Sequence, residues 1–363
     1  MPRCLSSFIL RVRGKPRGGV SLDQSAAMTE AVSVVEVVRN AVPESWHRVH
    51  VAVVDARGML RASTGDPELS TFFRSSSKPM QALPLVDDGA AERFGITPAE
   101  LALCCGSHSG SARHVAAAES ILLKAGCTAE ALACGAHPPF DDHTRHELEE
   151  AGLAPGRLHN NCSGKHAGML LLARAHGWET DGYQRVEHPV QGRMLAEVAR
   201  WAQVPQEAVG LGTDGCGVVT FALPLRHMAL AYAGFAAAAR AGELGPSRIV
   251  EAMTAHPEMV AGEGRICTEL TRVAGGRVFA KIGAEGVYCV GVPGAELGIA
   301  LKVEDGAQRA AGPAIIAVLR ELDLISEDDL GRLHTFVFPE VVNTRGETVG
   351  QLRPRIHLTT PDA

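Results

Sequence analysis

The spacing of apolar residues predicts strands at both ends of the chain. Near the start, HVAVVD (His50–Asp55) is rich in β-branched residues, an Arg-Gly turn follows, and Met59–Ala62 returns as a second strand. Further along, three short β-rich runs separated by Gly and Pro predict an antiparallel meander, at Val278–Gly283, Val287–Val292 and Gly298–Val303.

Helical patterns dominate between these strands. In RSSSKPMQ (Arg74–Gln81), Pro79 fits only the first turn of a helix, which would begin near Ser76. Thr97–Leu103 reads as a helix that opens with a TPAE capping box. Other helices are expected at Ala116–Lys124, Lys165–Trp178, Val190–Trp201, His227–Ala241, Ser247–Ala255 and Ala307–Leu322. The stretch 130–162 is expected to be rich in loops.

This order of elements predicts an α+β fold, with one antiparallel sheet built from both ends of the chain and flanked by helices. Residues 28–363 would form a single domain, with a mostly helical insertion at about 90–260 over one end of the sheet. Residues 1–27 carry five basic residues and one acid, and we expect a disordered tail or an upstream extension before a true start at Met28. A transit peptide is the less favoured alternative.

Composition narrows the possible partners and location. The 363 residues are 46% hydrophobic and only 4% aromatic, so the core should be mainly Ala, Val and Leu. A net charge of −6 argues against nucleic acid or an anionic membrane as a partner. No apolar run is long enough to span a bilayer. Nine cysteines without a preceding secretory signal favour reduced thiols and a cytoplasmic location.

The first candidate for chemistry is the S-x-x-K pair at the predicted helix start. Ser75 and Lys78 stand one turn apart on the same face. A serine hydroxyl becomes a good nucleophile when a nearby base accepts its proton, and a lysine kept neutral by burial or neighbouring cations can be that base. The alternative is a helix-capping serine followed by a solvated lysine.

Two glycine-containing segments carry possible metal ligands. HNNCSGKHAG places Cys162, Lys165 and His166 within one turn of a helix start, and GTDGCG offers Asp214 and Cys216. Two cysteines with another donor would suit zinc. The alternative is that Cys162 and Cys216 are small buried hydrophobic residues, as most free cysteines are, and Cys162 with His166 is a further possibility as a nucleophilic pair.

Each of two further residues could have either a chemical or a structural role. Ser107, in CGSHSG, lies between glycines where a backbone can approach a ligand closely, or it is a turn serine. Lys281, in AKIGAEG, is a lone cation among apolar strand residues, or a solvated lysine that protects a sheet edge.

Taken together, the motifs resemble the asparaginase II family, the Rhizobium etli type, also called class 3 L-asparaginases. The resemblance spans about Val49–Leu322. It rests on six segments in a fixed order: SSSKPMQALPLV, CGSHSG, CGAHPP, HNNCSGKHAGML, GTDGCGVVTFALPL, and AGEGR with AKIGAEGV.

The resemblance implies hydrolysis of the side-chain amide of L-asparagine to L-aspartate and ammonia, in a fold similar to serine β-lactamases and glutaminases. It implies two Ser-Lys pairs, Ser75 with Lys78 and Ser107 with Lys281. Ser75 would be the nucleophile and Lys78 its base. Ser107 and Lys281 would relay protons to the leaving ammonia and keep Lys78 neutral.

The resemblance also implies a zinc site and a substrate-binding set. The zinc ligands would be Cys162, Lys165 and Cys216, with water as the fourth, and the metal would shape the pocket more than attack the substrate. The residues that match the family's pocket lining are Arg74, His166 and Asp214. There a cation would meet the substrate α-carboxylate, and Asp214 its α-ammonium group. A homodimer is also implied.

Two other classes of function share part of this pattern. A penicillin-recognising serine hydrolase would also have S-x-x-K, and Lys281-Ile282-Gly283 resembles its K-T-G strand, but no S-D-N or Y-x-N motif is present. A non-catalytic amino-acid-binding protein would keep the pocket without needing the nucleophile.

Overall fold

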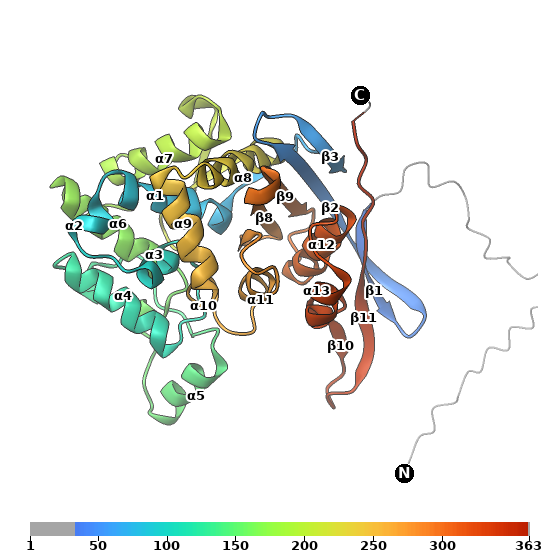
Figure 1. Ribbon diagram of the computed structural model, residues 1–363. Helices are drawn as coiled ribbons and strands as arrows, with labels where there is room; N and C mark the ends of the chain where they lie inside the picture. The colour runs from blue at the N-terminus through green and yellow to red at the C-terminus, as the bar shows by residue number, and fades with distance from the viewer. Residues whose placement is uncertain (1–32, 362–363) are drawn as a thin grey trace, which may run out of the picture. The chain divides into compact units, whose positions relative to one another are not determined.

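An antiparallel sheet of eight strands forms the centre of the computed structural model, which describes residues 33–361 (Figure 1). The strand order is β10-β11-β1-β2-β9-β8-β7, and β3 pairs with the second half of β2. The bounds are β1 (Val34–Arg39), β2 (Val42–Asp55), β3 (Leu60–Thr64), β7 (Phe279–Ile282), β8 (Val287–Val292), β9 (Leu297–Val303), β10 (Glu340–Val342) and β11 (Thr348–Arg355). The expected disordered tail at residues 1–27 lies outside the described residues.

The central pairing joins strands from opposite ends of the chain. β2 pairs with β9 over seven residues, with Val51 opposite Leu301 and Val53 opposite Ile299. The predicted hairpin and meander are both present, and the α+β class with an antiparallel sheet is confirmed.

Helices cover both faces of this sheet, because alternate residues along a strand point to opposite sides. Ala52 and Val54 of β2 pack into one hydrophobic core with α8 (Leu225–Arg240). Val51 and Val53 face the other core, under α12 (Gln308–Glu321). The sheet is therefore buried on both faces, which explains its runs of consecutive apolar residues.

The chain between β3 and β7 is mostly helical. Its helices are α1 (Lys78–Asp87), α2 (Ala90–Arg93), α3 (Pro98–Cys104), α4 (Ala112–Lys124), α5 (Asp142–Glu150), α6 (Ser163–His176), α7 (Pro189–Ala202), α8, α9 (Leu244–Ala255), α10 (Pro257–Val260) and α11 (Ile266–Val273). A small sheet in the order β4-β6-β5 joins Ser70–Phe72, Val219–Pro224 and Gly210–Thr213. After β9 and α12, α13 (Glu327–Arg332) and α14 (His334–Val337) precede β10.

The longer predicted helices are present within a few residues of their expected bounds. α3 begins with the predicted capping box, in which Thr97 and Glu100 bond each other's backbone. The expected helix start near Ser76 is a 3₁₀ turn at Arg74–Ser77, after which α1 begins at Lys78 with Pro79 in its first turn.

Sequence reasoning omitted some elements whose patterns are weak. Most of α5 is exposed and has almost no apolar stripe, so the expectation of loops across 130–162 was wrong there. β11 has one buried residue, Leu352, and contains Gly350 and Pro354, residue types that strands usually avoid.

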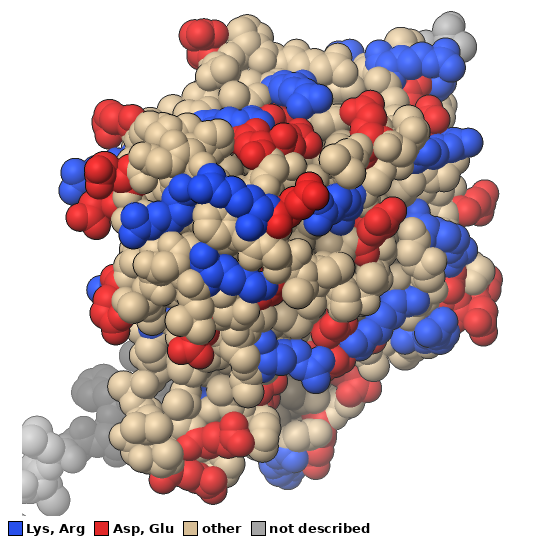
Figure 2. All heavy atoms as spheres, turned by 60° about the vertical axis from the view of Figure 1, so that its left-hand side comes forward, with Lys and Arg blue, Asp and Glu red and all other residues tan. Residues whose placement is uncertain are grey.

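On the face turned forward in Figure 2, basic and acidic side chains are interspersed, without a broad field of one sign. Within residues 33–361, no helix has the length and apolar character needed to cross a membrane.

Candidate active site

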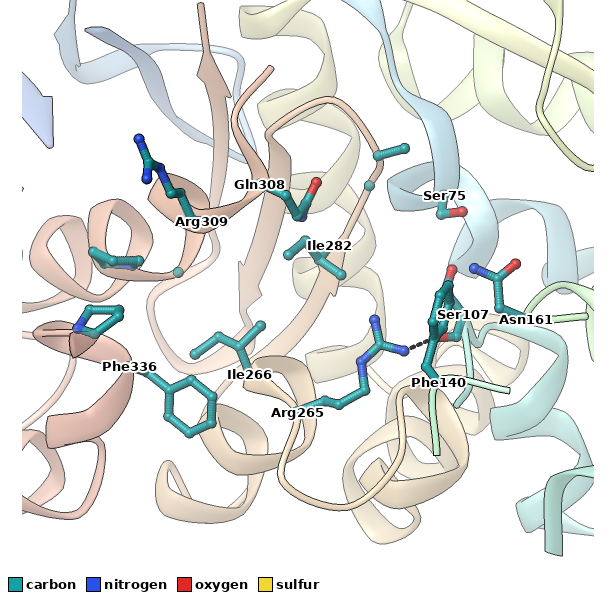
Figure 3. Close-up of a pocket in the computed structure, with 15 residues that line it drawn as sticks. Ser75, Ser107, Phe140, Asn161, Arg265, Ile266, Ile282, Gln308, Arg309 and Phe336 are labelled. Atoms are coloured by element: carbon teal, nitrogen blue, oxygen red, sulfur yellow. Dashed lines mark hydrogen bonds between the residues drawn. The ribbon is translucent and has the colours of Figure 1, made fainter. Parts of the chain in front are cut away.

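Ser75 lies at a pocket because its two neighbouring serines are held by the backbone. Ser76 donates a hydrogen bond to the carbonyl of Lys281 at 2.8 Å, and Ser77 donates to the carbonyl of Arg74 at 2.8 Å. Both are buried, whereas Ser75 is half-buried and lines a pocket of about 410 Å³ (Figure 3). The 3₁₀ turn thus anchors two serines and presents the third.

The turn is fixed at its start by an unusual backbone conformation. Arg74 has φ of +50°, in the left-handed region that non-glycine residues seldom occupy. Just before it, the buried Phe73 bonds Phe221 of β6 through its backbone at 2.7 Å. Strain of this kind persists where the surrounding structure enforces it, and it is concentrated at functional sites.

Ser107 also lines the pocket, and its hydroxyl lies between two lysines. Lys78 Nζ is 2.9 Å and Lys281 Nζ is 3.0 Å from Ser107 Oγ. Lys78 also bonds the carbonyl of Gly106 and, at 3.2 Å, the sulfur of Cys162, while Lys281 donates to the carbonyl of Ile282 at 2.7 Å. The structure therefore brings both predicted lysines to one serine.

The direct contact expected between Ser75 and Lys78 is replaced by this arrangement. Among the described residues, Lys78 has no hydrogen bond to Ser75, because its ammonium group is directed to Gly106, Ser107 and Cys162. Sequence spacing set the two residues one turn apart, but it could not show which way the lysine turns.

Both lysines are fully buried, at 0% exposure. Lys281 sits on β7, an end strand of the sheet, yet its side chain points into the protein and is not a solvated edge charge. Burial, together with the nearby cation of Lys78, lowers the pKa of Lys281 to about 7. An amine with this pKa can exchange a proton near neutral pH.

The predicted zinc ligands gather beside this cluster. Lys165 Nζ is 3.1 Å from Cys216 Sγ and 3.9 Å from a carboxylate oxygen of Asp214. A hydrogen bond from Cys162, aided by the cation of Lys165, lowers the pKa of Cys216 to about 5. The same contact with Cys216, together with burial, raises the pKa of Cys162 to about 12, as expected when two thiols share one proton.

A metal would find two sulfurs and one amine here. Within residues 33–361, no group of three or more His, Cys, Asp or Glu side chains is arranged to hold a metal ion. Cys162, Lys165 and Cys216 are all buried and mutually close, with Lys165 supplying the third donor. This donor set fits a thiolate-preferring metal only if the amine of Lys165 loses its proton.

The three predicted substrate-binding residues differ in their surroundings. Arg74 Nε donates to Asp214 at 2.8 Å, so these two are an ion pair. Burial alone would raise the pKa of Asp214, but Lys165 and Arg74 outweigh it and lower the pKa. His166 is fully buried and bonds the hydroxyl of Tyr183 at 2.6 Å, and burial lowers its pKa to about 3. His166 is therefore neutral, and it is not among the residues that line the pocket.

Of the 15 residues that line the pocket, only Ser75 and Ser107 were predicted as site residues from the sequence. Phe140, Asn161 and Arg265 line the pocket beside Ser75 and Ser107 (Figure 3). Asn161 lies in HNNCSG and Arg265 in AGEGR, two segments that carry the family resemblance. The signal was present, but no nearby residue indicated what these side chains would do.

A serine at a pocket, beside a second serine held between two buried lysines, is the set of groups that a serine-type hydrolase uses. The chain matches the L-asparaginase II family over residues 35–354 and belongs to that family.

Other comparisons add little to this assignment. Among solved structures, the chain is similar to one titled "Crystal structure of Mglu in its native form in the presence of 4.3M NaCl", with 17% identity and a TM-score of 0.36. The match covers 78% of this chain and 63% of that one, so the chain spans less than two thirds of that protein's length. A TM-score at this level does not define a common fold. No curated protein matches the chain.

Proposed function

We propose that this protein hydrolyses the side-chain amide of L-asparagine to L-aspartate and ammonia, with Ser75 as the nucleophile. The observation that carries the proposal is the buried Lys78–Ser107–Lys281 cluster at the wall of the pocket that Ser75 lines. Membership of the L-asparaginase II family supports the choice of substrate.

In the first half of the reaction, Ser75 Oγ attacks the amide carbon and loses its proton to the lysine cluster. The carbon–nitrogen bond then breaks as the amide nitrogen receives a proton, and ammonia leaves. An ester between Ser75 and the aspartyl group remains. In the second half, water attacks this ester, the proton passes back through the same cluster, and L-aspartate leaves with the serine restored.

The pKa of Lys281 and the hydrogen bonds of both lysines suit these proton transfers. Lys281, with a pKa of about 7, exists in both protonation states near neutral pH. Ser107 accepts from one lysine and can donate to the other, so a proton can pass between Lys78 and Lys281 without crossing water. Lys78 is the base nearest in sequence to Ser75, and in this proposal its amine turns from Ser107 toward Ser75 to accept the proton.

On the substrate side, Asp214 binds the α-ammonium group in this proposal, with Arg74 holding its carboxylate in place at 2.8 Å. His166 and Tyr183 pack as a neutral, hydrogen-bonded support in the same buried region. We propose that Cys162, Lys165 and Cys216 are ligands of a zinc ion. When bound, the zinc would fix these side chains and shape this side of the pocket.

The test is ammonia release from L-asparagine by the purified full chain and by Ser75→Ala, with zinc content read by atomic absorption. Activity in the parent that is lost in a folded Ser75→Ala variant with unchanged zinc supports the proposal. No ammonia from a folded, zinc-containing parent refutes it.

Hydroxylamine separates the two candidate nucleophiles. If an aspartyl ester forms, hydroxylamine competes with water and yields the β-hydroxamate of aspartate. Ser75→Ala should abolish the hydroxamate completely. Ser107→Ala should slow its formation, because the proton path is broken while the nucleophile remains. Hydroxamate from Ser75→Ala with none from Ser107→Ala would move the nucleophile to Ser107.

Two rival functions have simple tests. Nitrocefin hydrolysis would favour a penicillin-recognising hydrolase, and binding of L-asparagine without turnover would favour an amino-acid-binding protein. We also propose a cytoplasmic homodimer, which light scattering of the purified protein and fractionation of cells would check.

A further inference from the structure

Within residues 33–361, two arginines that line the pocket, Arg265 and Arg309, form no ion pair with an acidic side chain. We infer that Arg265 binds the α-carboxylate of the substrate and so selects amides that carry a carboxylate close to the scissile group. The inference rests on the proposed function and names the anion-binding residue of that same site.

The contacts of Arg265 differ from those of nearby arginines. Its Nη1 donates to the carbonyls of Ser107 at 3.1 Å and Ala261 at 3.4 Å, and its guanidinium lies 5.3 Å from the centre of the Phe140 ring. Within residues 33–361 it forms no ion pair. By contrast, Arg272 of the same helical segment pairs with Glu263 at 2.6 Å.

Arg265 is half-buried and has N–H donors that remain available to a ligand. A guanidinium carries five N–H donors in a rigid plane that matches the two oxygens of a carboxylate. Among described residues, only Nη1 of Arg265 has hydrogen-bond partners, and these are neutral carbonyls. Burial also lowers the pKa of Arg265, a cost that an anionic ligand would offset.

The side chain points to the place where a substrate must lie. Arg265 precedes α11 and extends across the pocket toward Ser107, and its other terminal nitrogen faces the space between Ile282 and Ser75 (Figure 3). In asparagine the carboxylate carbon is three bonds from the amide carbon. An amide held at Ser75 can therefore place its carboxylate within reach of this guanidinium.

Arg309 and Arg74 are the competing cations. Arg309 lies on the side of the pocket away from Ser75 and is bound through Nε to His47 Nε2 at 3.0 Å (Figure 3). The surroundings of Arg74 also argue against it. Its guanidinium is already bound to Asp214 at 2.8 Å. A paired arginine offers a carboxylate little net attraction, because the substrate would have to compete with Asp214. The two arginines thus have separate tasks, Arg74 toward Asp214 and Arg265 toward the ligand.

The experiment measures binding by calorimetry in a Ser75→Ala background, so that no turnover interferes. The two ligands are L-asparagine and 3-aminopropanamide, which is asparagine without its α-carboxylate. The variants are Arg265→Gln, Arg265→Lys as the conservative change, Arg74→Gln for the competing arginine, and Arg272→Gln on the following helix, α11, as a matched control. Circular dichroism checks that each variant is folded.

We expect Arg265→Gln to weaken L-asparagine binding roughly 10- to 100-fold, the range for loss of a charged hydrogen bond. Binding of 3-aminopropanamide should be as weak in the parent background as in the variant. Arg265→Lys should retain part of the affinity, and Arg272→Gln all of it. In the active enzyme, Arg265→Gln should raise KM more than it lowers kcat.

Unchanged affinity for L-asparagine in Arg265→Gln overturns the inference. So does an equal loss of affinity for L-asparagine and for 3-aminopropanamide. Absence of L-asparagine binding by the Ser75→Ala protein that retains Arg265 overturns it as well. Loss confined to Arg74→Gln would assign the carboxylate to Arg74 instead. Ammonia release by the parent is measured separately. A parent that turns over asparagine without dependence on Arg265 refutes only this inference; Arg265-dependent binding without turnover refutes only the proposed function.

Discussion

Replacing Lys281 by methionine should change how stability depends on pH. Lys281 is fully buried, with its pKa lowered from the ordinary 10.5 to about 7. Above pH 7 the folded protein holds this amine neutral, whereas the unfolded chain keeps it protonated until about pH 10.5. The unfolded state therefore binds more protons in this window, and the free energy of unfolding rises with pH. Below pH 7 both states are protonated, and the full penalty of the buried charge remains.

The size of this effect follows from the pKa difference. Each pH unit between the two pKa values changes the free energy of unfolding by about 1.4 kcal/mol, and the slope is half that at pH 7 itself. Between pH 7 and pH 9 the contribution of Lys281 is about 2 kcal/mol. Lys281→Met has no proton to lose, so its stability should lack this rise.

Urea denaturation at pH 7, 8 and 9 measures the difference between the parent and Lys281→Met. Lys124→Met is the control, since Lys124 lies on α4 away from the pocket and pairs with Glu100. We expect the gap between parent and Lys281→Met to change by about 2 kcal/mol across this range, as worked from the linkage relation. Parallel curves for the two proteins would refute the assignment of a neutral buried lysine. In the same range, kcat/KM of the parent should rise through about pH 7.

Two further predictions concern the metal and the core. Cys216→Ser should lower the zinc content measured by atomic absorption, because a hydroxyl is a poorer zinc ligand than a thiolate. The control Cys127→Ser replaces a free cysteine outside the proposed ligand set and should leave the zinc content unchanged. Equal zinc content in the two variants would contradict the proposed site. Gly298→Ala should cost about 3 kcal/mol or more by urea denaturation, because its Cβ would lie 1.9 Å from the carbonyl oxygen of Ala229. Gly294→Ala, where a Cβ meets nothing within 4 Å, is its control, and equal stability of the two variants would contradict the prediction.

Local patterns were sufficient for much of the fold. Three elements are predicted by residues within the element itself, and the structure confirms all three. They are α3 with the capping box at Thr97, α1 with Pro79 in its first turn, and β2 with its β-branched run. β11 could not be found in this way, because Gly350 and Pro354 oppose strand formation locally and the strand is stabilised by pairing with β1 and β10.

The site shows the same division. The spacing of Ser75 and Lys78 marked the pocket, and the motif residues Ser107 and Lys281 were found through family resemblance. The direction in which Lys78 turns depends on Gly106 and Cys162, which are distant in sequence. Likewise, nothing near Arg265 in the chain reveals that it forms no ion pair within residues 33–361, since that depends on which carboxylates the fold brings within reach.

The pairing of β2 with β9 also has a consequence for how the protein is made. Ser107 and Lys281, whose contact is 3.0 Å, are 174 residues apart in the chain. During synthesis on the ribosome, β2 must wait for β9, which emerges only after the whole helical middle. Such distant pairings are slow to form and leave strand edges unpaired in the meantime. An incomplete chain that stops before β7 has no second lysine at Ser107, so under the proposed mechanism we expect activity only in molecules whose sheet has closed.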